Sequence, residues 1–401
     1  MSTIPLLPPI VGVATSQTAV TNDQTQNGQV TASQQFDVNA VSDQTVATTT
    51  ATGNAYSGAV EAGSIDVQSN QSMQAGASAS TTLNVETDAG QTVALTTEAN
   101  GNATEIDSLG GGAVTGSFGQ QTGAVTITTD SQINAANAQA GDISAASTAV
   151  ANNLGMTNVG GSNTTFVEQT NAGSVDAEGG ATLNYTGGTA SLSALAVGNN
   201  VNSAGGPASN GNINVSQSNT GDLTQAAQFV TMGNAQTLAN ATTATGNNIS
   251  ITNQDGPLQV VTAQDNSSYV RSQAETVSYE WGLSSTIATG VGNSAMIGQY
   301  GQAVDIDNSQ TNRGAGIDVI SNTSGTDGYD ISGSATAMGN SVTGFACSAC
   351  DGVLTAHNTQ INSADIGASN SVGVVSSARS ATGVATAVGN SATFYVSHPS
   401  S

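Results

Sequence analysis

Few side chains in this sequence have the residue types and spacing that catalysis requires. The only histidines are His357 and His398, and neither has Asp or Glu neighbours at the spacing of a metal site. The same scarcity leaves no basis for a Ser-His-Asp centre. Glycine-rich stretches such as 292–301 are followed by no lysine, which phosphate-binding loops require. We therefore expect a protein that is not an enzyme.

The two cysteines form the one conspicuous short motif. Cys347 and Cys350 stand in a Cys-x-x-Cys arrangement, which occurs in redox motifs and as half of a zinc site. No further zinc ligands lie near, and no βαβ frame for a thioredoxin-like site is recognisable. We interpret the pair as a small disulfide that closes a turn in an oxidising compartment.

Aspartates recur at similar places along the chain, in the segments 63–67, 173–177, 316–320 and 363–367. Carboxylate oxygens are ligands for calcium, so a calcium site is one interpretation. The nonapeptide pattern of calcium-binding solenoids is absent, which favours a solvated acidic face. We expect no cofactor, with calcium as the alternative left open.

Aromatic residues are scarce, but four of them lie within a short part of the chain. They are Tyr269, Tyr279, Trp281 and Tyr300. Exposed rings would offer platforms for stacking on sugars, whereas buried rings would fill an irregular part of a core. The sequence leaves both interpretations open.

The charge balance excludes several classes of partner. Against 27 Asp and Glu stand only three Lys and Arg, so the formal net charge is −24. Nucleic acid and anionic membrane surfaces are bound by Lys and Arg, and we expect neither as a partner. A cationic polymer, a divalent ion or solubility outside the cell fits this charge better.

The chain divides into three parts. We expect residues 1–20 to be a leader or anchoring segment, because the chain starts with an apolar stretch. The absence of basic residues and the presence of Pro5, Pro8 and Pro9 do not fit a signal peptide. Residues 21–396 form a repeat domain, and residues 397–401 form a tail. No stretch of 18 apolar residues is present to span a membrane as a helix.

Two sequence marks recur with one period throughout the repeat domain. A Gly-Asn pair recurs from Gly53-Asn54 to Gly389-Asn390 at steps of 46 to 50 residues, with Ala151-Asn152 as a degenerate copy. A glutamine recurs in phase with it. The eight glutamine marks are Gln24, Gln71, Gln121, Gln169, Gln217, Gln264, Gln310 and Gln360. A fixed period of this length is typical of stacked repeat architectures.

The residues between the marks favour strands over helices. Segment 212–219 alternates apolar and polar residues and would place Ile213 and Val215 on one face. Gly and Asn would supply the turn positions. We therefore predict an all-β β-solenoid of about eight 47-residue repeats, each made of two coils of about 23 residues, in a rod of about 77 Å. An eight-bladed propeller is the alternative.

The recurring amides would stack into ladders, each repeat satisfying the donors and acceptors of its neighbour. The predicted ladder residues are Gln169, Asn171, Gln217, Asn219, Gln310, Asn312, Gln360, Asn362, Asn199, Asn247, Asn293, Asn340 and Asn390. Terminal coils would expose strand edges, so self-association is expected as well.

Over essentially its whole length, the chain resembles the HfaD family of holdfast anchor proteins from stalked alphaproteobacteria. The resemblance rests on the Gly-Asn marks, on the Gln-Thr/Ser-Asn marks such as 169–171 and on the near absence of basic residues. The resemblance implies a protein on the extracellular side of the outer membrane that helps to hold a polar adhesive polysaccharide. It also implies a small fibre-forming anchor protein and an outer-membrane secretion-type protein as partners. The resemblance further implies that this polysaccharide contains N-acetylglucosamine and is partly deacetylated.

Three other functions compete with this interpretation. A generic adhesin, including a trimeric adhesin head, and a self-assembling surface filament would share the composition. A polysaccharide-processing enzyme on a β-helix is the alternative from another class, but Arg271, Arg313 and Arg379 are too far apart in the sequence to favour a basic groove.

Overall fold

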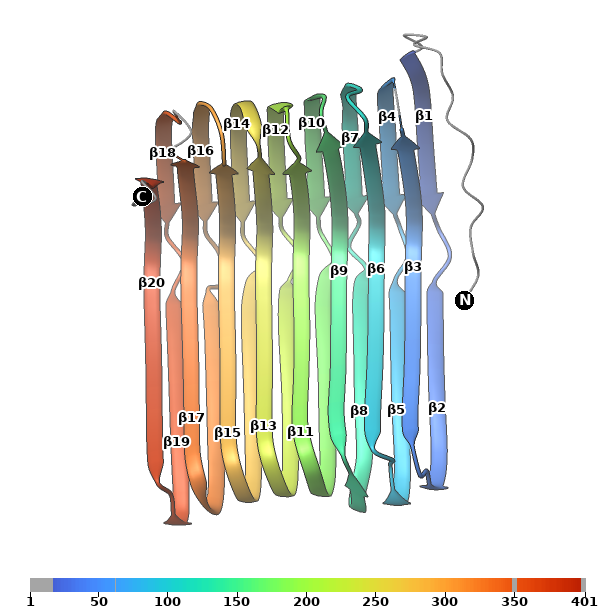
Figure 1. Ribbon diagram of the computed structural model, residues 1–401, viewed down its shortest axis with the longest axis vertical. Helices are drawn as coiled ribbons and strands as arrows, with labels where there is room; N and C mark the ends of the chain where they lie inside the picture. Colours follow the sequence, from blue (N-terminus) through green and yellow to red (C-terminus); the bar gives the residue numbers. More distant parts are fainter. Residues whose placement is uncertain (1–16, 62, 348–351, 398–401) are drawn as a thin grey trace.

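The computed structural model describes residues 17–61, 63–347 and 352–397, which form a β-solenoid (Figure 1). Apart from turns, these residues are strands, and all the paired strands run parallel. The described part of the chain contains no helix that is long and apolar enough to cross a membrane. The first strand begins at Gln17, inside the segment expected to be a leader, and the last ends at Ser397.

Each coil contains three segments, which we call a, b and c. The a segments are β1 (Gln17–Gln26), β4 (Ser64–Met73), β7 (Val114–Thr122), β10 (Ser162–Asn171), β12 (Ser209–Asn219), β14 (Asp255–Asn266), β16 (Val304–Asn312) and β18 (Leu354–Asn362). Separate b segments are β2 (Val30–Ala40), β5 (Ala77–Asp88), β8 (Thr126–Ala140) and β19 (Ile366–Ser377). Separate c segments are β3 (Gln44–Val60), β6 (Thr92–Leu109), β9 (Asp142–Val159) and β20 (Ser380–Ser397). In four coils b and c are continuous, as β11 (Ser174–Gly205), β13 (Leu223–Asn253), β15 (Tyr269–Gln299) and β17 (Ile317–Cys347).

One repeat makes one coil, and the expected division into two coils of about 23 residues is wrong. Gln17 pairs with Ser64 and Asn163 pairs with Val114, so stacked neighbours are a whole repeat apart. Half-repeats face one another across the core instead of stacking, and periodicity alone does not distinguish these two arrangements. At about 4.8 Å per coil, eight coils rise about 38 Å, not 77 Å. Parallel pairing between successive repeats also excludes the propeller.

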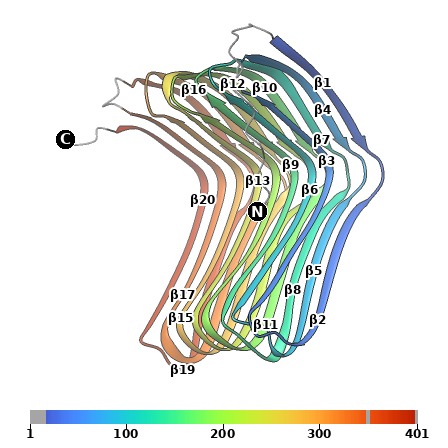
Figure 2. The same cartoon turned by 45° about the vertical axis from the view of Figure 1, so that its right-hand side comes forward.

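The coil is flattened and bent at mid-length (Figure 2). Segments a and b form one layer, above and below the bend, and segment c runs along the whole of the other layer (Figure 1). The core between the layers is built from alternate residues of every segment. Ile213 and Val215 are both buried in it, which confirms the strand alternation read from the sequence.

Side-chain size varies along the core. The part between the a and c segments contains mainly Ile, Val and Leu, such as Val167 and Ile249. The part at the bend contains mainly Ala, such as Ala196 and Ala244. A third part, between the b and c segments, again holds larger residues such as Leu183 and Leu238. Small residues at the bend allow the two layers to approach closely there.

The Gly-Asn marks lie inside strands, so their expected role as turn residues is wrong. Gly246 and Asn247 both belong to β13, and Gly246 is not among the described glycines with positive φ. A Cβ atom on Gly246 would lie 2.3 Å from the Asn266 side-chain Oδ1 and 2.6 Å from the Gly292 carbonyl oxygen. Glycine recurs here because the neighbouring amide and the next coil leave no room for a side chain.

Candidate functional site: an amide spine and a turn-edge groove

A glutamine ladder runs along the interior of the a segments. Gln169 Nε2 donates to Gln120 Oε1 at 2.7 Å and to the Asn200 carbonyl oxygen of segment c at 2.8 Å. Gln217 repeats both contacts one coil later, to Gln169 and to Asn248. Each glutamine therefore ties its coil to the preceding coil and joins the two layers of its own coil.

The third member of this ladder is Gln120, not Gln121 as the sequence marks suggested. Gln120 is buried beside Phe118 and Thr122, and its Nε2 donates to Gln71 Oε1 at 2.9 Å. Gln121 is exposed on the opposite face of the strand. Successive strand residues point to opposite faces, so a shift of one position moves a side chain from core to solvent.

An asparagine ladder faces the glutamines from the c segments. Asn199 Nδ2 donates to Asn247 Oδ1 at 2.8 Å and to the Ser218 carbonyl oxygen of the next coil at 3.0 Å. The same pattern joins all eight coils, from Asn54 to Asn390. The asparagine N–H groups point toward the following coil, whereas the glutamine N–H groups point toward the preceding one.

A second asparagine ladder covers only five coils. It begins with Asn171, whose Nδ2 donates to Asn219 Oδ1 at 2.8 Å, and continues to Asn362. In the three preceding coils this position is occupied by Gln26, Met73 and Thr122. Together the three ladders form an internal spine of hydrogen-bonded amides, in which buried polar groups are satisfied across coils.

The external feature with the clearest binding geometry is a groove along the turns between segments b and c, at the lower edge in Figure 1. Its volume is about 810 Å³. We call it the turn-edge groove, and its walls come from five successive coils. The lining residues are Tyr185, Thr186, Gly187, Asn234, Ala235, Gln236, Glu280, Trp281, Gly282, Asp327, Gly328, Tyr329 and Ser377.

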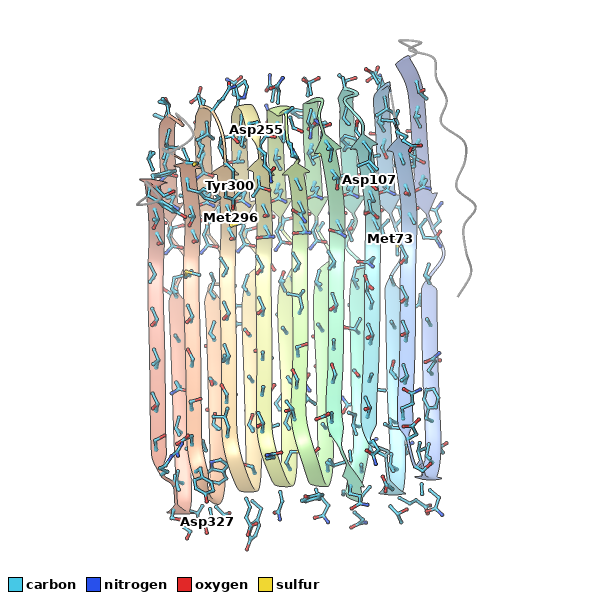
Figure 3. The ribbon with its side chains drawn as sticks, in the orientation of Figure 1. Met73, Asp107, Asp255, Met296, Tyr300 and Asp327 are labelled. Carbon is cyan, nitrogen blue, oxygen red and sulfur yellow. The ribbon has the colours of Figure 1, made fainter. Side chains whose placement is uncertain are left out.

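Strand register places the polar residues of this groove in one column. Tyr185 pairs with Asn234, Asn234 with Glu280, Glu280 with Asp327, and Asp327 with Ser377. Five coils at about 4.8 Å spacing give a column of about 19 Å. Asp327 is labelled at this edge in Figure 3. The groove is therefore suited to an extended ligand that runs along the solenoid axis.

The groove combines exposed aromatic side chains with acidic ones. Tyr185 is 47% exposed and Tyr329 is 63% exposed, so both rings offer a face to solvent. Neither Glu280 nor Asp327 forms an ion pair with a described residue, although the Ser377 hydroxyl donates to Asp327. Two unpaired carboxylates on adjacent coils attract cationic groups, and exposed tyrosines bind apolar sugar faces or ammonium groups.

Arginine is present only at one end of the groove. The Arg379 guanidinium pairs with Asp330, and its central carbon lies 5.7 Å from the centre of the Tyr329 ring. The hydrogen bond from Arg379, the hydrogen bond from the Ser380 hydroxyl and the arginine charge hold the pKa of Asp330 below its usual range. Because Arg379 is paired with Asp330, it leaves the carboxylates of Glu280 and Asp327 uncompensated.

Trp281 forms part of the groove floor and not a stacking platform. It is 3% exposed and lies against the next coil at Gly325 and Gly328. A Cβ atom on Gly325 would lie 2.1 Å from the indole Cζ3, which explains why glycine occupies that position. Of the two interpretations of the aromatic residues, burial therefore applies to Trp281.

The other three predicted aromatic residues do not form one cluster. Tyr279 is 59% exposed and lines an adjoining hollow with Met232 and Val277. Tyr269 is half-buried, and its hydroxyl lies 3.3 Å from Asp318 Oδ2. Tyr300 lies near the other edge of the coils, where its ring packs edge-on against Phe345 at 5.2 Å (Figure 3). The structure thus separates residues that are neighbours in the sequence.

The remaining candidate residues are dispersed. Cys347 ends β17, whereas Cys350 lies outside the described residues, so the predicted disulfide stays a prediction. Among the described residues, no group of three His, Cys, Asp or Glu side chains is arranged to hold a metal ion. Asp176 is half-buried near Glu178 and Asp130, and burial together with these charges raises its pKa to about 6.

Comparison with known proteins identifies the family. Residues 39–316 match the family model of HfaD, described as holdfast attachment protein D. The chain belongs to the holdfast attachment protein D family. The match covers more than half of the chain and confirms the resemblance that the repeat marks suggested. No curated protein and no solved structure gave a significant match.

Sequence reasoning did not identify the turn-edge column of this family member. Tyr185, Glu280 and Asp327 belong to three coils and share neither a residue type nor a flanking motif. They could have been found only by aligning the repeats on the ladder amides and comparing the residues that occupy equivalent places. A column of unlike residues leaves no periodic signal, in contrast to the spine.

Proposed function

We propose that the chain is a non-enzymatic structural protein of the cell surface that anchors the adhesive polysaccharide of the holdfast to the outer membrane. Its family is one of holdfast attachment proteins, which supports a role in adhesion at the cell surface. The observation that carries the polysaccharide part of the proposal is the turn-edge groove, with its exposed tyrosines and unpaired carboxylates.

The chemistry of the groove favours a polymer of amino sugars. Tyr185 and Tyr329 are exposed, and exposed aromatic side chains can stack on sugar rings. Glu280 and Asp327 lie on adjacent coils, and their carboxylates would bind ammonium groups on the same chain of sugars. The net charge of −24 adds long-range attraction for a cationic polymer and speeds its association.

Binding of defined oligosaccharides tests the groove directly. We expect oligomers of glucosamine to bind the purified chain and expect their N-acetylated counterparts to bind more weakly. Tyr185→Ala and Tyr329→Ala should each weaken binding about fivefold, the loss of about 1 kcal/mol of stacking. Tyr300→Ala is the matched control, because that ring is also exposed (52%) but lies far from the groove.

Charge variants separate the two parts of the recognition. Glu280→Gln with Asp327→Asn should weaken binding of glucosamine oligomers and leave N-acetylated oligomers unaffected. Glu105→Gln is the control, because it removes one exposed carboxylate from segment c outside the groove. Binding to the amine form that is unchanged by 0.5 M salt would refute the electrostatic part of the proposal.

Cells that lack the chain test the anchoring role itself. We expect such cells to synthesise the polysaccharide and to shed it into the medium, where a lectin stain would detect it. Polysaccharide that stays attached to these cells would favour a generic adhesin or a surface filament instead. Turnover of a polysaccharide by the purified chain would support the β-helix enzyme.

The proposed partners are those of the attachment machinery. Besides the polysaccharide, they comprise a small fibre-forming anchor protein and an outer-membrane secretion-type protein. Nucleic acid is not proposed as a partner, because only three basic residues are available for phosphate contacts. Affinity capture from cell envelopes with the tagged full chain would test both protein partners.

A further inference from the structure

The two ends of the described stack have complementary shapes. At the N-terminal end β1 and β2 are outermost (Figure 1). Ala51 of β3, in the same coil, is already buried. At the C-terminal end β20 is outermost, and its residues 380–387 are all exposed. Segments a and b therefore project at one end and segment c at the other, so that the two ends form matching steps.

Strand pairing is unused on the outer edges of these coils. Among the described strands, β20 pairs only with β17, and β1 pairs only with β4. Natural edge strands are commonly protected by Lys, Pro or bulges, because open edges pair with other chains. β1, β2 and β20 contain neither Lys nor Pro. Along β1, β2 and residues 380–396 of β20, no further described strand pairs with the outer edge, so the backbone N–H and C=O groups there are available to an additional parallel strand.

The direction of the amide ladders makes the two ends chemically complementary. At the C-terminal end the ladders present the Gln360 Oε1 acceptor and the Asn390 Nδ2 donors. At the N-terminal end they present a second N–H of Gln24 and the Asn54 Oδ1 acceptor. No described residue bonds to these four groups from outside the stack. A donor at one end thus corresponds to an acceptor at the other in both ladders.

Apolar and charged residues agree with this complementarity. Val30 at the N-terminal end and Ile366 at the C-terminal end occupy equivalent inward-facing positions, and both are only partly buried. The eighth coil carries one aspartate, Asp365, and one arginine, Arg379, so its formal charge is zero. An added coil at this end therefore meets little of the repulsion that the acidic coils elsewhere would cause.

From these observations we propose that a second copy of this chain stacks head to tail on the first, with β1–β3 of one copy continuing the sheets formed by β18–β20 of the other. Gln24 then donates to Gln360 of the other copy, and Asn390 donates to Asn54. Such a contact joins different surfaces on the two copies, so it propagates into an open filament. This inference does not depend on the polysaccharide-binding function proposed above.

Asn390→Asp tests the contact with little disturbance of the coil. The Asn390 side-chain oxygen accepts from Asn340, and a carboxylate oxygen keeps that bond. The change replaces the outward donor by an acceptor that faces Asn54 Oδ1 of the next copy. Asn212→Asp is the matched control, because it adds the same charge at an exposed position in the middle of the stack.

Analytical ultracentrifugation of the full chain over a range of concentrations provides the measurement. We expect elongated assemblies to form for the unsubstituted chain and for Asn212→Asp, and to require about tenfold higher concentration for Asn390→Asp. An unsubstituted chain that stays monomeric at all concentrations would overturn the proposal. Equal association of the two variants would overturn it as well.

Disulfide trapping tests the register and polarity. Continuing the ladders places Thr25 of one copy beside Ile361 of the other, and both residues are exposed. Mixed Thr25→Cys and Ile361→Cys chains should cross-link on oxidation, beyond the background of the unsubstituted chain. Thr359→Cys, two residues away, should cross-link poorly with Thr25→Cys. Predominant links between two Thr25→Cys chains would mean head-to-head contact and would refute the proposal.

Discussion

The amide spine is expected to contribute most stability where it is buried on both sides, and Asn247→Ala tests this. Asn247 is fully buried, donates to Asn293 Oδ1 at 2.8 Å and to the Asp265 carbonyl oxygen at 2.9 Å, and accepts from Asn199 at 2.8 Å. Its removal leaves three buried polar groups each with one partner fewer. At roughly 1–3 kcal/mol for each buried group that loses its partner, and with some relaxation, we expect a loss of about 3–5 kcal/mol.

Asn390→Ala is the matched control for this prediction. Asn390 belongs to the same ladder but lies in the last described coil, where it is exposed and accepts one hydrogen bond, from Asn340. We expect its replacement by Ala to reduce the free energy of unfolding by about 1 kcal/mol or less.

Chemical denaturation of the purified chain, followed by circular dichroism, supplies the assay for both variants. Repeat proteins can unfold in stages, so the transition midpoints and slopes are compared together with fitted free energies. Similar small losses for Asn247→Ala and Asn390→Ala would refute the reasoning, because they would mean that solvent satisfies the central amides as easily as the terminal one.

Three further predictions concern packing and pH. Gly246→Ala should destabilise the chain by about 1–3 kcal/mol, because the added Cβ would overlap the Asn266 amide. Gly373→Ala is the control: the nearest atom to its Cβ would be 3.8 Å away, so stability should change by less than about 0.5 kcal/mol. Thermal unfolding compares the two variants. Trp281→Ala should cost about 3–5 kcal/mol by opening a cavity, and an unchanged denaturation midpoint would contradict the buried position of the indole. The pKa of Asp176 is raised to about 6, so the folded state binds the proton of this carboxyl more tightly than the unfolded state does. Protonated Asp176 therefore stabilises the fold near pH 4, and this stabilisation is lost as pH rises through 6. Asp176→Asn should therefore add stability on the order of 1 kcal/mol above pH 7, a value already reduced for solvent screening, and none near pH 4. An equal gain in stability at both pH values would show that ionisation of Asp176 is not the cause.

The sequence by itself determined the fold class, the number of repeats and the character of the spine. Alternating residues such as Ile213 and Val215 specify strands because side chains of a strand alternate between two faces. Amides that recur at one period specify a ladder, because a buried amide in one repeat is satisfied most simply by the same amide in the next. The period, the alternation and the recurring residue types are all local or periodic properties, and the sequence records them directly.

Only the tertiary structure decided how each repeat is folded back on itself. The sequence period is the same whether two half-repeats stack or face each other, and the structure shows that they face each other across a thin core. The choice of Gln120 over Gln121 depended on which face of β7 is buried. The placing of Gly246 inside a strand depended on the approach of the Asn266 amide and the Gly292 backbone.

The turn-edge groove is likewise a product of the tertiary structure. Tyr185, Glu280 and Asp327 lie in one column because coils stack in register, although they are unlike residues separated by a whole repeat or more. Periodic signals reveal positions at which every coil needs the same residue. A binding surface needs different residues on successive coils, so its pattern exists only where the coils are brought side by side.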